Sequence, residues 1–109
     1  MPILFQVIDP RGKTISCSDE QWKDHVIQNK PFMQIYLEEV KKTLQNPDFI
    51  CQDVLHVKRQ CFYDRKIKAH GYLKVVVEFK TENEAELVTT FLADSGKKGE
   101  IIIWPPLSN

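Results

Sequence analysis

The hydrophobic pattern of this chain changes its period at Pro47. Across residues 33–44, apolar side chains recur with the 3.6-residue spacing of an amphipathic helix. After Pro47, apolar and polar residues alternate in short runs that are typical of strands, most clearly over residues 72–79. Helices followed by strands indicate an α+β fold in which the helices pack on a sheet.

The sequence predicts two helices within residues 17–46. Ser18 is a suitable N-cap for the first, and Gln21 follows three residues later, as in a capping box. Pro31 ends this helix and can open a second one at its first turn. Residues 47–104 are expected to form an antiparallel meander of four or slightly more strands. Residues 1–16 are expected to be a strand, a small hairpin or an arm, and residues 105–109 a tail.

The charge distribution is more informative than its sum. At 109 residues the chain fits one domain over 1–109, and its 15 basic and 15 acidic residues cancel. Residues 1–55 hold 6 basic and 8 acidic residues, residues 56–80 hold 7 and 2, and residues 81–109 hold 2 and 5, giving −2, +5 and −3. This basic segment is interleaved with aromatic residues, which is typical of a nucleic-acid surface but also of a merely solubilising sheet face.

Several classes of chemistry lack their sequence signature. There is no GxSxG nucleophile motif, no glycine-rich phosphate loop and no zinc-type Cys/His spacing, so neither a cofactor nor a metal is expected. No apolar run approaches the roughly 20 residues of a membrane span, and no secretory signal is evident. The number of cysteines is odd and their spacing matches no known motif, which indicates reduced thiols in a cytoplasmic protein. A disulfide between Cys51 and Cys61 is the alternative.

The side chains that remain as candidates suit the cleavage of RNA without a metal ion. In transphosphorylation the RNA supplies its own nucleophile, the 2′-hydroxyl, and the protein supplies an acid, a base and cations. His25, three residues after Trp22 in the first helix, is a candidate acid or base. The plainer interpretation is a solvent-exposed helical histidine without a role.

Short motifs follow one another in a fixed order over residues 15–104. They are Trp22-x-x-His25-Val26, Pro31-x-Met33, and Tyr36-Leu37-x-Glu39-Val40-x-x-Thr43-Leu44-x-x-Pro47-Asp48. This order resembles the phage-associated nuclease-like domains grouped with barnase, EndoU, colicin tRNases and RelE, which typically read W-x-x-H-I, then H-P-E, then a helix ending in a P-D pair. The counterparts of that family's strands are Tyr63 with Arg65, residues 72–77, Val88-Thr89-Thr90-Phe91 and residues 99–104.

The resemblance implies two helices on a four-stranded antiparallel sheet, with RNA cleaved across the sheet face. Transferred by position, the expected catalytic residues are His25, Tyr63, Arg65 and Thr89. The expected substrate-binding residues are Lys30, Arg59, Lys74 and Lys98, of which Arg59 and Lys98 rest on charge alone.

The chain departs from the family pattern in its second motif. Lys30 replaces the histidine of H-P-E and Phe32 replaces the glutamate. A lysine is not a side chain that titrates near neutral pH, so the acid/base pair is incomplete unless Tyr63, His56 or His70 completes it.

Three functions therefore stand as hypotheses. The leading one is a cytoplasmic, toxin-like, metal-independent endoribonuclease that acts on RNA. The alternative is a weak or inactive module on the same fold that binds RNA or an acidic protein partner, such as an antitoxin or immunity-type protein. The third is a homo-oligomer that pairs through residues 101–103, an apolar run typical of a central strand or an adhesive edge. The sequence leaves the oligomeric state and the RNA target open.

Overall fold

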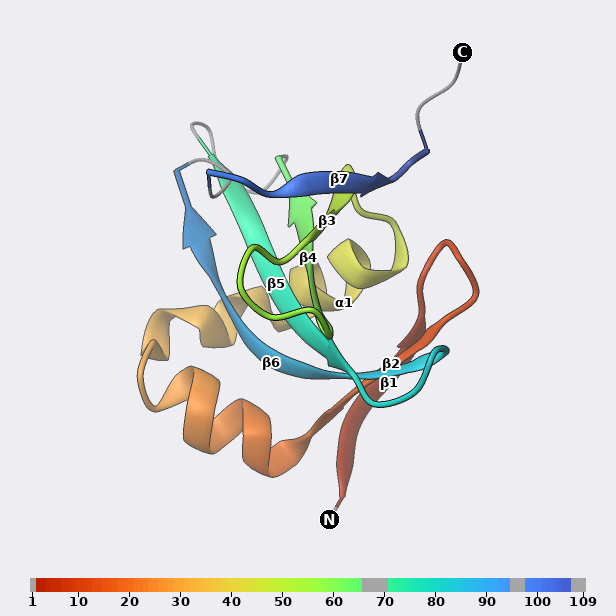
Figure 1. Cartoon of the computed structure of the whole chain (residues 1–109). Coiled ribbons are helices and arrows are strands. Elements are labelled where there is room, and N and C mark those ends of the chain that lie inside the picture. The colour runs from red at the N-terminus through yellow and green to blue at the C-terminus, as the bar shows by residue number, and fades with distance from the viewer. Residues whose placement is uncertain (1, 66–70, 95–97, 107–109) are drawn as a thin grey trace.

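The computed structural model describes residues 2–65, 71–94 and 98–106. These residues form a seven-stranded sheet with the order β1-β2-β6-β5-β4-β3-β7 (Figure 1). Neighbouring strands are antiparallel except β2 and β6, which run parallel, so the sheet is mixed. The strands are β1 (Ile3–Ile8), β2 (Thr14–Ser18), β3 (Phe49–Gln52), β4 (Arg59–Asp64), β5 (Tyr72–Phe79), β6 (Glu84–Ala93) and β7 (Ile101–Trp104).

The helical segments lie between β2 and β3 in the chain. The first, η1 (Gln21–Ile27), is a π-helical piece, and the Gln21 backbone N–H at its start donates to the Ser18 hydroxyl at 3.0 Å. The second begins at Pro31 as the 3₁₀ turn η2 (Pro31–Tyr36) and continues directly into the α-helix α1 (Leu37–Gln45). Pro31 suits this first helical position because a helix leaves the N–H there without a partner.

The predicted arrangement of two N-terminal helices on a four-stranded antiparallel meander is wrong. One continuous helical segment covers residues 31–45, and only the short η1 precedes it. Residues 1–16 belong largely to the sheet, because the β1–β2 hairpin joins β6 through a parallel pairing of Ser16 with Glu86 and their neighbours. At the other edge, β7 pairs with β3 and not with β6, the strand before it in the chain.

The main core lies between the helices and one face of the sheet. Leu73, Val75 and Val77 of β5 point into it, as their alternation predicted, and each is 0% exposed. Trp22 and Val26 of η1 are also buried there. Each such side chain contributes roughly 1.5–3 kcal/mol on burial, so this core holds η1 and α1 against the sheet.

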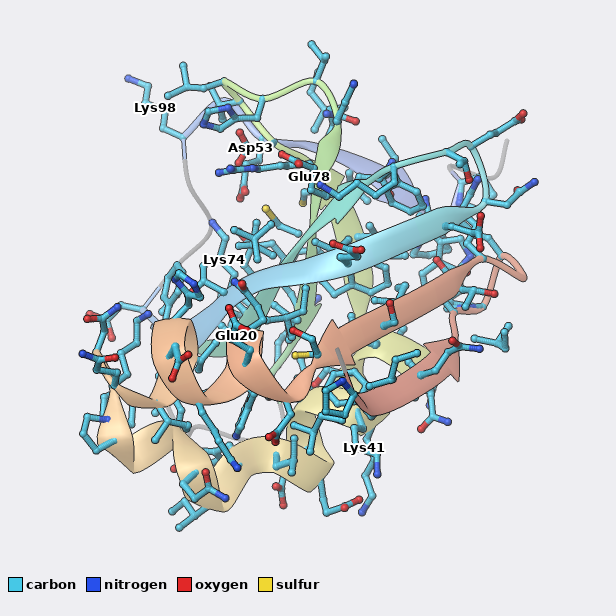
Figure 2. All side chains as sticks on the ribbon, turned by 90° about the horizontal axis from the view of Figure 1, so that it is seen from below. Glu20, Lys41, Asp53, Lys74, Glu78 and Lys98 are labelled. Carbon is cyan, nitrogen blue, oxygen red and sulfur yellow. The ribbon has the colours of Figure 1, made fainter. Side chains whose placement is uncertain are left out.

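The opposite side of the sheet, which we call the outer face, carries a second cluster. Its buried members are Cys51, Cys61, Tyr63 and Val76, with half-buried Phe49, Tyr72, Val88 and Phe91 packed around them. Figure 2 shows Lys74, Glu78 and Asp53 away from the helices, whose side is marked by Glu20 and Lys41. In the described part of the chain, no helix is long and apolar enough to cross a membrane.

Candidate functional site

A series of cations and aromatic rings crosses the outer face, and we call it the cation–aromatic row. The Arg65 guanidinium carbon lies 5.4 Å from the centroid of the Phe49 ring, which stacks on Tyr63 at 4.8 Å. The Lys74 ammonium lies 5.3 Å from the Tyr63 ring and 5.7 Å from that of Phe91. The row consists of Arg65, Phe49, Tyr63, Lys74, Phe91 and Lys30.

Lys30 completes the row from outside the sheet. Its ammonium lies 5.8 Å from the Phe91 ring and donates a hydrogen bond of 3.0 Å to the Thr89 hydroxyl. Lys30 stands between η1 and η2 with a non-helical backbone, φ −140°. The break at Pro31 thus places this side chain at β6. The sequence had singled out Lys30 and Thr89 separately, and the structure brings them together.

The local structure of β6 explains why Thr89 is available to Lys30. The parallel pairing with β2 ends at Glu86, and no other strand of the described residues pairs with the rest of β6 on that side. The Gln21 side chain donates to the Val88 carbonyl at 2.6 Å, which fixes η1 along this edge. Val88 is an extra residue between the pairings of Leu87 and Thr89, a β-bulge that keeps Thr89 on the outer face opposite Val76.

The middle of the row is a buried polar group. The Tyr63 hydroxyl donates to one carboxylate oxygen of Glu100, and the Lys74 ammonium donates to the other at 3.2 Å. The side chains of Lys74 and Glu100 are 8% and 4% exposed, and Tyr63 is fully buried. Burial, and then the bond to Glu100, raise the pKa of Tyr63 far above its ordinary value. Tyr63 is therefore held as a neutral donor to Glu100 at physiological pH.

His25 is not joined to the row. Its side chain is exposed on η1, beside the buried positions Trp22 and Val26. Among the described residues, no hydrogen bond or ion pair links its imidazole to Tyr63, Lys74 or Thr89. Its backbone carbonyl accepts a bond from the Asn29 side chain.

The other predicted cations occupy different parts of the molecule. Arg65 is exposed at the end of the row, and its backbone N–H donates to the Asp48 carboxylate at 2.6 Å. Arg59 forms an ion pair at 3.1 Å with Glu78, a carboxylate that Lys80 also contacts at 2.8 Å. Lys98 is exposed before β7 and lies well apart from Lys74 (Figure 2). His56 is exposed in the β3–β4 loop, whereas His70 lies outside the described residues.

Sequence reasoning missed Glu100, Asp53 and Phe91. Glu100 stands alone between a glycine and an apolar strand, which reads as an ordinary strand boundary. Asp53 follows β3, and its carboxylate accepts the backbone N–H groups of Leu55 and His56 as in an ordinary polar turn. Phe91 belongs to the Val88-Thr89-Thr90-Phe91 motif. Because it lies two positions after Thr89 on the same strand, the sequence could have placed it on the same face as Thr89.

A groove of about 360 Å³ opens elsewhere, where β2 and β6 diverge beside η1. Its lining contains none of the predicted site residues: Ile3, Ser16, Ser18, Gln21, Glu86 and Leu87.

Comparisons of the chain with protein-family models, with curated proteins and with solved structures found no match. The interpretation of the site therefore depends on its own geometry.

Proposed function

We propose that this protein binds single-stranded RNA along the cation–aromatic row and cleaves it without a metal ion, by attack of the RNA 2′-hydroxyl on the adjacent phosphate. The observation that carries this function is the 3.0 Å contact between Lys30 and Thr89 beside the Phe91 ring. It joins a cation, a hydroxyl and an aromatic surface, which together suit a phosphate and its base.

Each group at this contact has a defined chemical role. The Thr89 oxygen accepts a hydrogen from Lys30, so the hydroxyl's own hydrogen is free to donate to a phosphate oxygen. The Lys30 ammonium stabilises the negative charge that grows on the phosphate during attack. The 2′-hydroxyl proton goes to the imidazole of His25, the acid–base candidate on η1. As the 2′ oxygen bonds to phosphorus, the bond from phosphorus to the 5′ oxygen breaks, and the departing 5′ oxygen takes a proton from water.

A second function is an RNA-binding module without cleavage. The observation that favours it is the absence, among the described residues, of any bond from His25 to the row, together with a lysine where the related domains carry their second histidine. Both functions use the same surface in the cytoplasm, where Cys17, Cys51 and Cys61, all free thiols here, stay reduced. They differ only in whether the bound phosphate is attacked.

The test is a cleavage assay with labelled single-stranded RNA in the presence of EDTA. The wild type should produce fragments ending in a 2′,3′-cyclic phosphate. The matched substrate is the same RNA with 2′-O-methyl groups, which should bind but remain intact because its nucleophile is blocked. Thr89→Val and Lys30→Ala should each reduce the rate, by about 100-fold or more for the cation. Lys41→Ala removes the same charge on the helical side and should have no effect.

The outcomes separate the two functions. RNA binding that Lys30→Ala weakens, with no cleavage by the wild type, establishes the binding module and excludes the nuclease. Cleavage that His25→Ala abolishes, while RNA affinity is retained, establishes the nuclease. Equal cleavage by the wild type and Lys30→Ala refutes the site.

A further inference from the structure

Next to the row, three strands bring a thiol and two carboxylates together. The ligand atoms of Asp53, Cys61 and Glu100 all lie within 4.8 Å of one another. The Cys61 sulfur is 3.9 Å from an oxygen of Asp53. We call these residues, with Cys51, the acid–thiol pocket.

The strand pairing explains how the pocket forms. Cys51 of β3 stands directly opposite Cys61 of β4, so both thiols are neighbours on the outer face. Gln52 pairs with Ile101, which places Asp53 beside Glu100 at the start of β7. Cys51 and Asp53 are two positions apart, but Cys61 and Glu100 follow 10 and 49 positions after Cys51, and this spacing matches no common metal-binding motif.

Cys51 places a second sulfur next to Cys61 on the outer face. Its side chain belongs to a residue only 3% exposed, and no hydrogen bond to its thiol is present in the described part of the chain. Cys51 is thus a second buried sulfur on the outer face, directly opposite Cys61 in the strand pairing.

We propose that the acid–thiol pocket binds one zinc-like divalent ion through the Cys61 sulfur and one oxygen each of Asp53 and Glu100, with the Cys51 sulfur as the fourth ligand. Cys51 stands opposite Cys61 but outside the 4.8 Å group, so its side chain must turn toward the ion when the ion binds. Two sulfurs and two oxygens form a tetrahedral set that favours zinc over magnesium or calcium. With metal–sulfur and metal–oxygen bonds of about 2.3 and 2.0 Å, a tetrahedral sulfur–oxygen separation is about 3.5 Å. The observed 3.9 Å between Cys61 and Asp53 needs only a small closure.

The charges of the pocket are compatible with such an ion. Asp53 and Glu100 bring two negative charges and Lys74 brings one positive charge. A divalent ion that displaces the two thiol protons into solvent leaves this net charge unchanged. A carboxylate has about four lone-pair positions, so Glu100 can keep its bonds from Tyr63 and Lys74 while it binds the ion. Those two residues would then orient the ligand.

The experiment is a Co²⁺ titration of the reduced full chain, followed by displacement with Zn²⁺. The wild type should bind one Co²⁺ per chain, with the absorption of a tetrahedral ion and a thiolate charge-transfer band that Zn²⁺ removes. Cys61→Ser should weaken binding by at least about tenfold and remove about half of that band, and Cys51→Ser should do the same. The matched control is Cys17→Ser, which changes a buried thiol on the helical side and should leave binding unaltered.

Asp53→Asn is a second test variant that should remain folded, because it keeps both thiols and replaces only one half-buried carboxylate. It should retain the charge-transfer band but weaken Co²⁺ affinity. Binding without a thiolate band, or equal affinities in Cys61→Ser and Cys17→Ser, overturns the site. Because RNA cleavage is measured in EDTA, its failure leaves this result unaffected, and the reverse also holds.

Discussion

Replacing Lys74 with methionine examines the buried centre of the outer face. Methionine keeps most of the side-chain volume but removes the ammonium that contacts Glu100 at 3.2 Å. Because the Lys74 and Glu100 side chains are only 8% and 4% exposed, water cannot readily replace this contact. The loss in the free energy of unfolding should therefore resemble that of breaking a buried ion pair, not a surface ion pair.

The expected loss in the free energy of unfolding is about 3 kcal/mol, at the lower end for removing one partner of a buried pair. Methionine retains apolar contact with Tyr63 and Phe91 and offsets some of the lost cation–π attraction. For a domain of this size, about 3 kcal/mol corresponds to a decrease of roughly 13 °C in melting temperature.

The assay is urea unfolding monitored by tryptophan fluorescence, in EDTA so that no bound metal contributes. The double variant Lys74→Met/Glu100→Gln should lose less than the two single variants together, with a coupling of about 2 kcal/mol. Lys23→Met is the matched control, because its 3.0 Å pair with Asp19 involves a lysine side chain that is 67% exposed. Its unfolding midpoint should not change measurably.

A loss below about 1 kcal/mol for Lys74→Met would refute the reasoning, since it would mean that water reaches the pair. A coupling energy near zero between Lys74→Met and Glu100→Gln would also refute the reasoning. In that case the two side chains would contribute independently, and the 3.2 Å contact would not be the source of the stability.

Two further predictions concern the backbone and the thiols. Gly71 has φ +141° and a Cβ there would overlap the Ala93 carbonyl oxygen, so Gly71→Ala should cost about 2 kcal/mol or more in urea unfolding. Gly12→Ala, at φ +85° but in open space, should cost only about 1 kcal/mol, and equal losses would contradict the close approach. Burial, and then Asp19, raise the pKa of Cys17 from 9.0 to about 12, so the folded state keeps a proton that the unfolded chain releases above about pH 9. That stabilisation is present below about pH 9 and is lost towards pH 12, so melting temperatures from pH 8 to 11 should decline less steeply in Cys17→Ala, and an unchanged decline would contradict the assignment.

The strands themselves were readable from local alternation, but their partners were not. Alternation in residues 72–79 predicted the buried face of β5, and Leu73, Val75 and Val77 confirm it. The pairing of β2 with β6 joins residues about 70 positions apart and leaves no periodic signal. The η1 segment was read as an ordinary helix because Trp22 and Val26, four residues apart, suit a π-helical turn as well as an α-helical one.

The candidate site, too, could be predicted from the sequence only in part. Residue type and motif order were enough to single out Lys30 and Thr89, but not to show that they meet. Lys74 stands between Leu73 and Val75 on the face that alternation assigns to water, yet the residue is 6% exposed. Glu100 covers it from the segment before β7, and only the pairing of β7 with β3 determines that placement.

Burial also determines which parts of the row an RNA could reach first. Tyr63 and Lys74 are enclosed by their bonds to Glu100. If RNA binds as proposed, its phosphates are therefore expected to meet Lys30 with Thr89 at one end of the row and Arg65 at the other. Half-buried aromatic rings lie between these ends and suit bases better than phosphates. Two phosphate contacts give a logarithmic salt slope of only about −1.4 for a single strand. A surface of that size needs no net positive charge on the whole chain, which agrees with the balance of 15 basic and 15 acidic residues.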